Sequence, residues 1–212
     1  MRLLRTFHLR PTAHPLVRIG SAYGGYVVPL PLVAPDWIAY SVGIGEDASF
    51  DLDLIRRTRC TVRAFDPTPR AARYLAALPE RPPQLTYHAF GIWNRDGEVR
   101  FFAPRDPSHV SHSIHNLQGT STSIAVPMKT LASAMREAGD ARIDLLKLDV
   151  EGAEYDILDD LLATAVRPRI VCAELHDPWP RRNLALVRRL RAAGYQLVAL
   201  EPPTVTLVRL GG

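Results

Sequence analysis

The sequence lacks several features that would place it in a special class of protein. No segment approaches the 18 or more apolar residues of a membrane span. There is no internal repeat and no low-complexity tract. The first 20 residues contain arginines but neither a sustained apolar core nor a small-residue cleavage site, so they do not read as a signal peptide. We therefore expect a cytoplasmic protein that does not bind membranes.

Cysteine is scarce. The two cysteines, Cys60 and Cys172, both lie in apolar, strand-like runs. That placement suits free buried thiols in a reducing compartment better than a disulfide framework.

The composition is that of a globular protein. The chain has 212 residues, of which 47% are hydrophobic and 23% charged, and this length is ordinary for one α/β domain. The net charge is +4, much of it from arginines scattered through both halves of the chain. Scattered arginine is more typical of a solvated surface than of a nucleic-acid footprint, so a nucleic-acid partner is not expected.

Strand-like and helix-like segments alternate along most of the chain. Residues 1–36 are rich in proline and glycine and predict an irregular or hairpin-like lead-in that packs on a domain spanning 37–212. Within that domain the pattern predicts strands at 37–42, 60–65, 85–90, 124–128, 143–148, 169–175, 196–200 and 204–209, and helices at 47–57, 69–78, 130–139, 153–163 and 182–194. The Asp-Gly turn in "NRDGEVRFF" suggests a hairpin inserted after the third strand. The alternation predicts a mostly parallel sheet covered by helices on both faces, with a C-terminal antiparallel hairpin at one edge.

Ligands bind beyond the carboxyl ends of the strands in such a sheet. Five groups of residues follow predicted strands, and four of them contain a carboxylate: 43–47, 66–68, 88–92, 149–154 and 174–179.

The first group contains a glycine turn, "SVGIGED". Gly43 and Gly45 allow a sharp turn and a close approach to a ligand, while Ala48 completes G-x-G-x-x-G/A. The spacing fits a dinucleotide or an adenosyl cofactor, and it also fits a plain strand-to-helix turn.

Asp66 ends the second strand, 21 residues after Gly45. A carboxylate there can accept hydrogen bonds from both hydroxyls of a ribose. The alternative is that Asp66 caps helix 69–78. Coupled to the glycine turn, ribose binding is the favoured interpretation.

The most specific motif is "LLKLDVEGAE", residues 145–154. It resembles the C-terminal hallmark of the FkbM-type family of S-adenosylmethionine-dependent methyltransferases, and "SIAVPMKTLASAM" and "VCAELH" are similar to the segments that flank that hallmark. The chain departs from the family pattern at "YSVGIGEDASFD" and in carrying Asp66 where glutamate is usual. The resemblance implies a Rossmann-like class I methyltransferase fold with a seven-stranded sheet, S-adenosylmethionine as cofactor, and O-methylation of a sugar or natural product in secondary metabolism.

The resemblance also implies roles for the residues at the strand ends. Asp149 is expected beside the methyl donor, Glu154 is expected mainly to stabilise the start of helix 153–163, and Glu151 stays open between the two roles. The candidate cofactor-binding residues are Gly43, Gly45, Glu46, Asp66, Thr68, Gly91, Ile92 and Asp149.

Histidines compete for the role of general base. His176 at the end of the fifth strand is the first candidate, because a pKa near 6.5 suits proton acceptance at neutral pH. The loop histidine His112 is the alternative, with Asp149 as the orienting group and Glu151 as a further catalytic candidate. The loop 104–119 is interpreted as an acceptor lid. A divalent ion held by Asp149, Glu174 and His176 is the less favoured mechanism, so no metal is expected.

Two other functions stay in competition. A nicotinamide-dependent oxidoreductase fits the glycine turn and Asp66 but not the motif at 147–154. An RNA-binding or RNA-methylating protein fits the basic charge, but no aromatic-rich basic stripe is present. The methyl acceptor and the oligomeric state, a homodimer included, are left open by the sequence.

Overall fold

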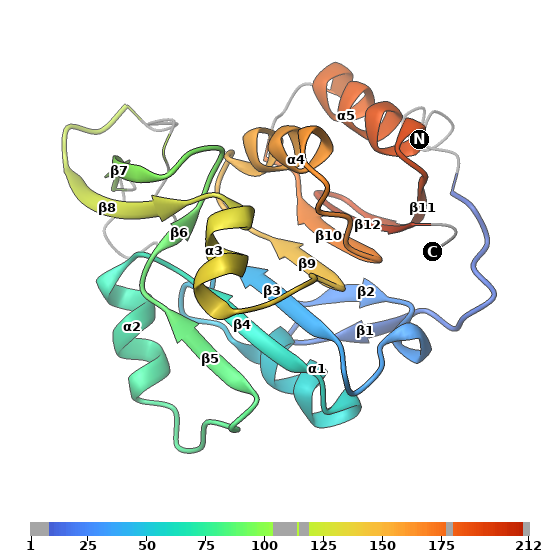
Figure 1. Cartoon of the computed structure of the whole chain (residues 1–212), viewed down its shortest axis with the longest axis horizontal. Coiled ribbons are helices and arrows are strands. Elements are labelled where there is room, and N and C mark those ends of the chain that lie inside the picture. The colour runs from blue at the N-terminus through green and yellow to red at the C-terminus, as the bar shows by residue number, and fades with distance from the viewer. Residues whose placement is uncertain (1–8, 104–113, 115–118, 177–179, 210–212) are drawn as a thin grey trace.

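A computed structural model describes residues 9–103, 114, 119–176 and 180–209 (Figure 1). The candidate base His112, and with it most of the predicted acceptor lid, lies outside the described residues.

The described residues form a seven-stranded sheet in the order β11-β12-β10-β9-β3-β4-β5. Every neighbouring pair from β10 to β5 is parallel, and β12 runs antiparallel to both β10 and β11. The predicted mostly parallel sheet with a C-terminal antiparallel hairpin is therefore confirmed. The strands are β3 (Ile38–Val42), β4 (Thr61–Phe65), β5 (Leu85–His88), β9 (Leu145–Leu148), β10 (Ile170–Glu174), β11 (Tyr195–Glu201) and β12 (Thr204–Arg209).

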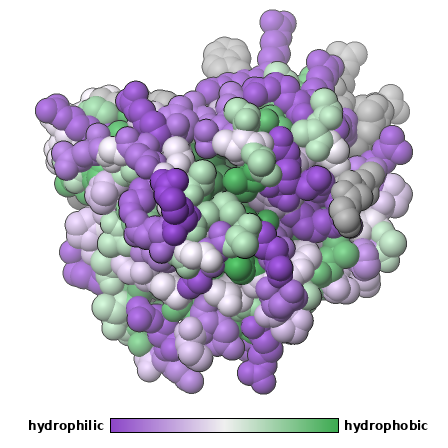
Figure 2. Space-filling model, viewed as in Figure 1, coloured by the Kyte–Doolittle hydropathy of each residue, from purple (hydrophilic) through white to green (hydrophobic). Residues whose placement is uncertain are grey.

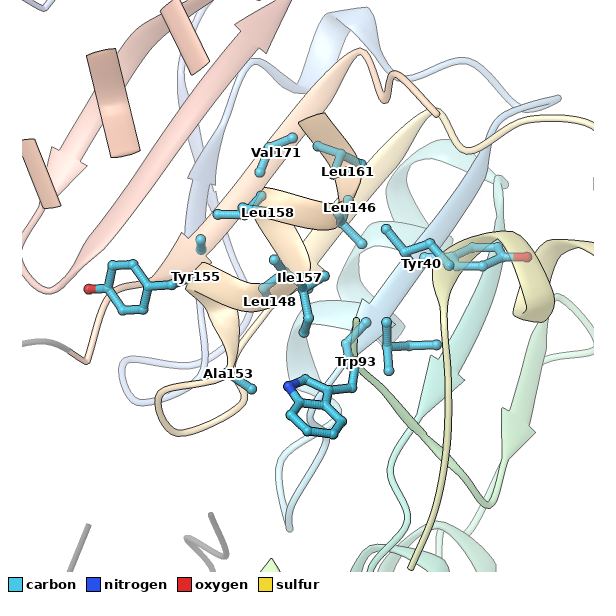
Figure 3. Close-up of a cluster of buried hydrophobic side chains, with 14 of the residues drawn as sticks. Tyr40, Trp93, Leu146, Leu148, Ala153, Tyr155, Ile157, Leu158, Leu161 and Val171 are labelled. Atoms are coloured by element: carbon cyan, nitrogen blue, oxygen red, sulfur yellow. The ribbon is translucent and has the colours of Figure 1, made fainter. Parts of the chain in front are cut away.

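Helices cover both faces of this sheet. The helices are α1 (Ser49–Thr58), α2 (Pro69–Ala76), α3 (Leu131–Ala138), α4 (Glu154–Ala163) and α5 (Pro180–Ala192). Because side chains alternate along a strand, Leu146 and Leu148 pack under α3, α4 and α5, whereas Leu145 packs under α1 and α2. Figure 3 shows the first of these cores, where Ile157, Leu158 and Leu161 of α4 lie over β9.

A second, three-stranded sheet lies beside the main one. It consists of β6 (Gly91–Ile92), β7 (Gly97–Phe102) and β8 (Ser123–Lys129), in the order β6-β8-β7. The hairpin predicted around the Asp-Gly turn is wrong in one respect, because β6 and β7 do not pair with each other but flank β8. The turn joins strands whose shared partner lies some 30 residues further on, a long-range pairing that local turn chemistry does not encode.

The lead-in contains a short hairpin of β1 (Val17–Ile19) and β2 (Tyr26–Val28), followed by a 3-10 helix, Leu30–Leu32. Tyr26 and Val28 are buried in the core under α1, and the Thr206 hydroxyl donates a hydrogen bond to the Val27 carbonyl at 2.7 Å. The lead-in thus packs on the same sheet face as α1.

Both cysteines lie in the core, as the sequence predicts. Cys60 and Cys172 are buried and free. Among the described residues, no helix is long and apolar enough to cross a membrane. On the face seen in Figure 2, hydrophobic residues are scattered among hydrophilic ones.

Candidate active site

The glycine turn after β3 lies against the end of β9, where the strand order reverses. Gly43 has φ +82°, and a Cβ there would lie 1.7 Å from the Asp149 carbonyl oxygen. No other residue type fits, since both the φ value and the space are restricted to glycine. The turn is fixed from both sides, because the Gly43 amide donates to the Phe65 carbonyl at 2.9 Å and the Asp149 amide donates to the Val42 carbonyl at 3.0 Å.

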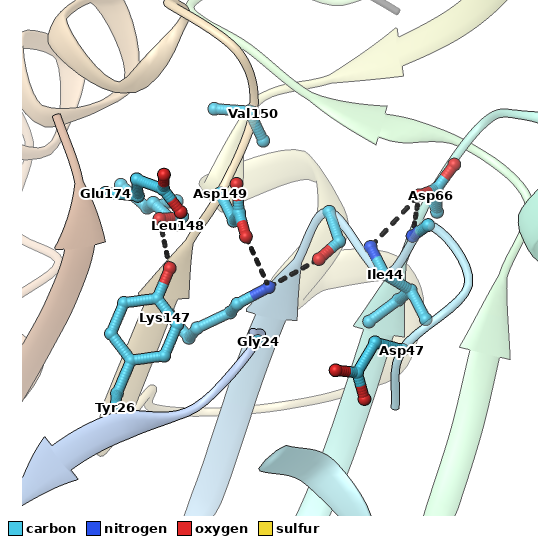
Figure 4. A network of polar contacts seen from close by, with 12 residues as sticks. Gly24, Tyr26, Ile44, Asp47, Asp66, Lys147, Leu148, Asp149, Val150 and Glu174 are labelled. Carbon is cyan, nitrogen blue, oxygen red and sulfur yellow. Dashed lines mark hydrogen bonds and ion pairs between the residues drawn. The ribbon is translucent and has the colours of Figure 1, made fainter. Parts of the chain in front are cut away.

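Asp66 holds this turn in place. One of its carboxylate oxygens accepts hydrogen bonds from the amides of Ile44 (3.0 Å, Figure 4) and Gly45 (2.9 Å). The other accepts hydrogen bonds from the amide (2.8 Å) and hydroxyl (2.6 Å) of Thr68. A carboxylate offers about four lone-pair sites, and all four are used. Asp66 is only 5% exposed, so its observed role is to tie the turn after β3 to the turn after β4.

The alternative of Asp66 as a helix cap is wrong. Thr68 is the N-cap of α2, and its side chain accepts from the Ala71 amide. Ribose binding by Asp66 stays a prediction. The nearby Glu46 is more accessible, and it forms an ion pair with Arg70 at 2.8 Å.

Lys147 and Asp149 form the centre of the polar network in Figure 4. The buried Lys147 ammonium donates to the Gly43 carbonyl at 2.5 Å and lies 3.7 Å from an Asp149 carboxylate oxygen. The side chain of Asp149 is 27% exposed and is accessible to a ligand, whereas the side chain of Lys147 next to it is 5% exposed. Lys147 thus joins the first glycine of the turn to the carboxylate at the end of β9.

One pocket is formed by residues that follow β3, β4 and β9. Its walls include all eight candidate cofactor-binding residues, Gly43, Gly45, Glu46, Asp66, Thr68, Gly91, Ile92 and Asp149, and also Glu151. Phe65, Ile92 and Met128 form an apolar side, and a Cβ on Gly91 would lie 2.5 Å from the Met128 sulfur. This apolar slot lies beside a carboxylate rim that consists of Asp149 and Glu151. The combination fits a donor that joins an adenine ring to cationic sulfur and amino groups.

His176 lies behind this rim and is not among the residues that form the pocket wall. Its Nδ1 donates to Glu154 at 2.6 Å, and its Nε2 lies 3.5 Å from Glu151 and 3.7 Å from Glu174. Although burial opposes the charge, the hydrogen bond and the charge of Glu154, then Glu151 and Glu174, raise the pKa of His176 to about 9.

The premise of the base hypothesis, a pKa near 6.5 for His176, is therefore wrong. At neutral pH the imidazole is protonated, and a protonated imidazole cannot accept a proton. Burial and the neighbouring Asp149 and Glu151 also raise the pKa of Glu174. The three acidic groups around His176, which are Glu154, Glu151 and Glu174, make it a cationic partner rather than a base.

Glu154 is completely buried as the first residue of α4. Its carboxylate accepts hydrogen bonds from the amides of Val150 (3.2 Å) and Gly152 (3.0 Å) as well as from His176. Glu154 thus shapes the turn between β9 and α4. Glu151 sits in that turn with φ +52°, a left-handed conformation that is uncommon for a side-chain-bearing residue.

Asp149, Glu151 and His176 present ligand atoms within 4.8 Å of one another, which is close enough for a divalent ion. The predicted alternative set used Glu174 in place of Glu151. An ion bound by either set of residues would have to displace a proton from His176.

The sequence did not single out Tyr23, Gly24 or Asp47, which also form the pocket wall. No local pattern marks Tyr23, because its position depends on how the lead-in folds back over α1. Lys147 was visible within the motif but received no role, although its alternation opposite Leu146 and Leu148 predicts that it points to the α1 face.

Asp66→Ala is expected to weaken donor binding by about 1.5 kcal/mol or more, roughly tenfold, because the turn that carries Gly43 and Gly45 loses its anchor. Calorimetric titration with S-adenosylhomocysteine measures the change. Asp159→Ala, which removes an exposed carboxylate on α4, is the control. An unchanged affinity in folded Asp66→Ala protein would remove Asp66 from the donor site.

Comparison with known proteins agrees with the motif. Residues 36–197 match the family model of the methyltransferase FkbM domain. The chain is 28% identical over 144 residues to probable methyltransferase-like protein 24 of Homo sapiens and, equally, to that of Rattus norvegicus, over 66% of this chain and 33% of each relative. The chain thus spans about a third of the length of these curated relatives.

Solved structures are similar at a lower level. Aeropyrum pernix fibrillarin, solved with natively bound S-adenosyl-L-methionine, gives a TM-score of 0.48 at 13% identity, over 95% of this chain and 85% of that one. A precorrin-6y C5,15-methyltransferase from Geobacter metallireducens gives a TM-score of 0.45 at 11% identity, over 84% of this chain and 83% of the other.

Proposed function

The chain belongs to the FkbM methyltransferase family, and from that premise we propose that it methylates a hydroxyl group of a sugar or another natural-product small molecule. S-adenosylmethionine is the cofactor, and family membership leaves the nicotinamide-dependent oxidoreductase without support. The observation that carries the choice of a hydroxyl acceptor is the rim formed by Asp149 and Glu151, which both form the pocket wall. Ionised carboxylates only accept hydrogen bonds, so they suit an acceptor that donates them.

The same rim argues against RNA as the acceptor. Asp149 and Glu151 form the pocket wall, Glu174 lies behind them next to His176, and together these carboxylates would repel a phosphate backbone. The basic net charge of the chain comes mainly from arginines elsewhere, such as those on α5.

Cofactor chemistry sets what the protein must add. S-adenosylmethionine supplies an electrophilic methyl group on a positively charged sulfur. The protein must align the acceptor oxygen with that methyl group and remove the hydroxyl proton. We assign alignment to Asp149, which Lys147 fixes against the glycine turn, and proton removal to Glu151. The left-handed backbone at Glu151 supports that choice, because such strain persists mainly where surrounding structure and function require it.

His176 then has a supporting role. Protonated and paired with the buried Glu154, it lies 3.5 Å from Glu151 and keeps that carboxylate in place. This is a positioning role in place of the predicted general base. His112, the loop alternative, lies outside the described residues and stays a prediction.

A screen of neutral sugars, amino sugars, sugar phosphates and a short RNA with methyl-labelled donor tests the acceptor class. We expect labelled product from a neutral or amino sugar and none from the RNA. Label transferred to RNA alone would contradict the proposal. Label that is stable in alkali indicates a methyl ether on a hydroxyl group, whereas a methyl ester on a carboxylate would be hydrolysed.

A further inference from the structure

The tip of the N-terminal hairpin is built against the glycine turn. The Ser21 hydroxyl donates to Asp47 at 2.5 Å, and the Ser21 amide donates to the Ser49 hydroxyl at 2.7 Å. Gly24 lies so close that a Cβ there would be 2.8 Å from the Asp47 carboxylate. In Figure 4, Gly24 lies near Lys147 and Asp47, below Asp149. These contacts fix residues 21–24 at the pocket although they precede the family match, which begins at residue 36.

Tyr23 is the prominent side chain of this tip. It forms part of the pocket wall, and yet it is 82% exposed, well above the exposed Leu9 (47%) and Leu16 (40%) of the same N-terminal segment. An aromatic ring that is exposed to water at the edge of a pocket has a face that a ligand can cover. Covering that face gains the free energy of burying the ring.

The charges around Tyr23 indicate which ligand the ring suits. Although most of Tyr23 is exposed, partial desolvation raises the pKa of its phenol, and the negative charges of Asp149, Glu151, Glu174 and Asp47 raise it further, so the phenol stays neutral. A neutral aromatic ring surrounded by carboxylates is an arrangement that binds organic cations. The donor carries two positive groups, its sulfonium and its amino group, whereas the demethylated product has lost the sulfonium charge.

We propose that Tyr23 is a donor-binding residue whose ring covers the cationic sulfonium of S-adenosylmethionine, so that the N-terminal hairpin completes the donor pocket. Tyr23 thereby discriminates the charged donor from the uncharged sulfur of the product and favours product release. The inference rests on the donor and is independent of which acceptor is methylated.

Calorimetric titration of the full chain with three nucleosides tests this. The probes are S-adenosylmethionine, sinefungin, which carries an ammonium group near the sulfonium position, and S-adenosylhomocysteine, whose sulfur is neutral. Tyr23→Ala is expected to weaken the two cationic ligands about 2- to 30-fold more than the neutral one, the range of a cation–π contact. Tyr23→Phe, which keeps the ring, is expected to bind all three like the wild type.

Leu16→Ala is the matched control, because Leu16 is also exposed and belongs to the same N-terminal segment. An unchanged ratio of S-adenosylmethionine to S-adenosylhomocysteine affinity in Tyr23→Ala would overturn the inference. So would a Tyr23→Phe variant as weak as Tyr23→Ala, since the hydroxyl and not the ring would then be responsible. If the wild type bound none of the three, the donor assignment would fail as well.

Discussion

Glu151→Gln is expected to lower kcat about a hundredfold to ten-thousandfold, the usual cost of removing a general base. Glutamine keeps the size of the side chain and its carbonyl oxygen but cannot accept the proton at neutral pH. Because glutamine preserves the size of the side chain that Glu151 contributes to the pocket wall, affinity for S-adenosylhomocysteine should stay within about twofold. Labelled methyl transfer to the acceptor found in the screen gives kcat, and calorimetry gives the affinity.

Glu80→Gln is the control for this experiment, because Glu80 is exposed in the loop after α2. A kcat within about threefold of the wild type in Glu151→Gln would exclude Glu151 as the base. Asp149 would then be the remaining candidate on the rim.

His176→Ala is expected to destabilise the fold by about 3 kcal/mol, because it leaves the fully buried Glu154 without its cationic partner. Glu154 keeps its two hydrogen bonds from backbone amides, so we expect a loss of stability at the low end of the range of about 3 to 5 kcal/mol for breaking a buried ion pair. For a chain of this size the midpoint of thermal unfolding should fall by roughly 6 to 12 °C. His14→Ala, in the N-terminal segment, is the control for loss of an imidazole.

The destabilisation should depend on pH in a defined direction. His176 has a folded-state pKa of about 9, above the unfolded value of about 6.5. A raised pKa contributes stability that is fully present below pH 6.5 and is lost as pH rises through 9. The difference in unfolding free energy between wild type and His176→Ala, measured with denaturant, should therefore shrink between pH 7 and pH 10. A difference that is constant over this range would show that His176 is not the charged partner of Glu154.

The fold was largely predictable because its signals are local. Alternating strand and helix patterns and the strand-end rule placed the glycine turn, Asp66 and Asp149 at one edge, and the structure brings all three into one pocket. Element bounds moved by only a few residues, as with α3, which begins after its N-cap Thr130 and ends before Gly139.

The parts that the sequence could not predict depend on distant contacts. The environment of His176 is set by Glu154, Glu151 and Glu174, which come from two different strand ends and a helix. A residue's ordinary pKa cannot reveal that combined field. Asp66 likewise follows its strand as expected, but two of its four donors, the amides of Ile44 and Gly45, come from the turn after β3, which only the fold brings beside it.

A crystal structure of the chain with S-adenosylhomocysteine tests the central claim, that the pocket at the ends of β3, β4 and β9 holds the methyl donor, most directly. We expect the nucleoside to contact the glycine turn at Gly43 and Gly45 and the apolar slot at Ile92, with its sulfur on the side of Asp149. A nucleoside bound elsewhere on the chain would contradict the account. So would an empty pocket in a crystal grown at a saturating concentration of S-adenosylhomocysteine.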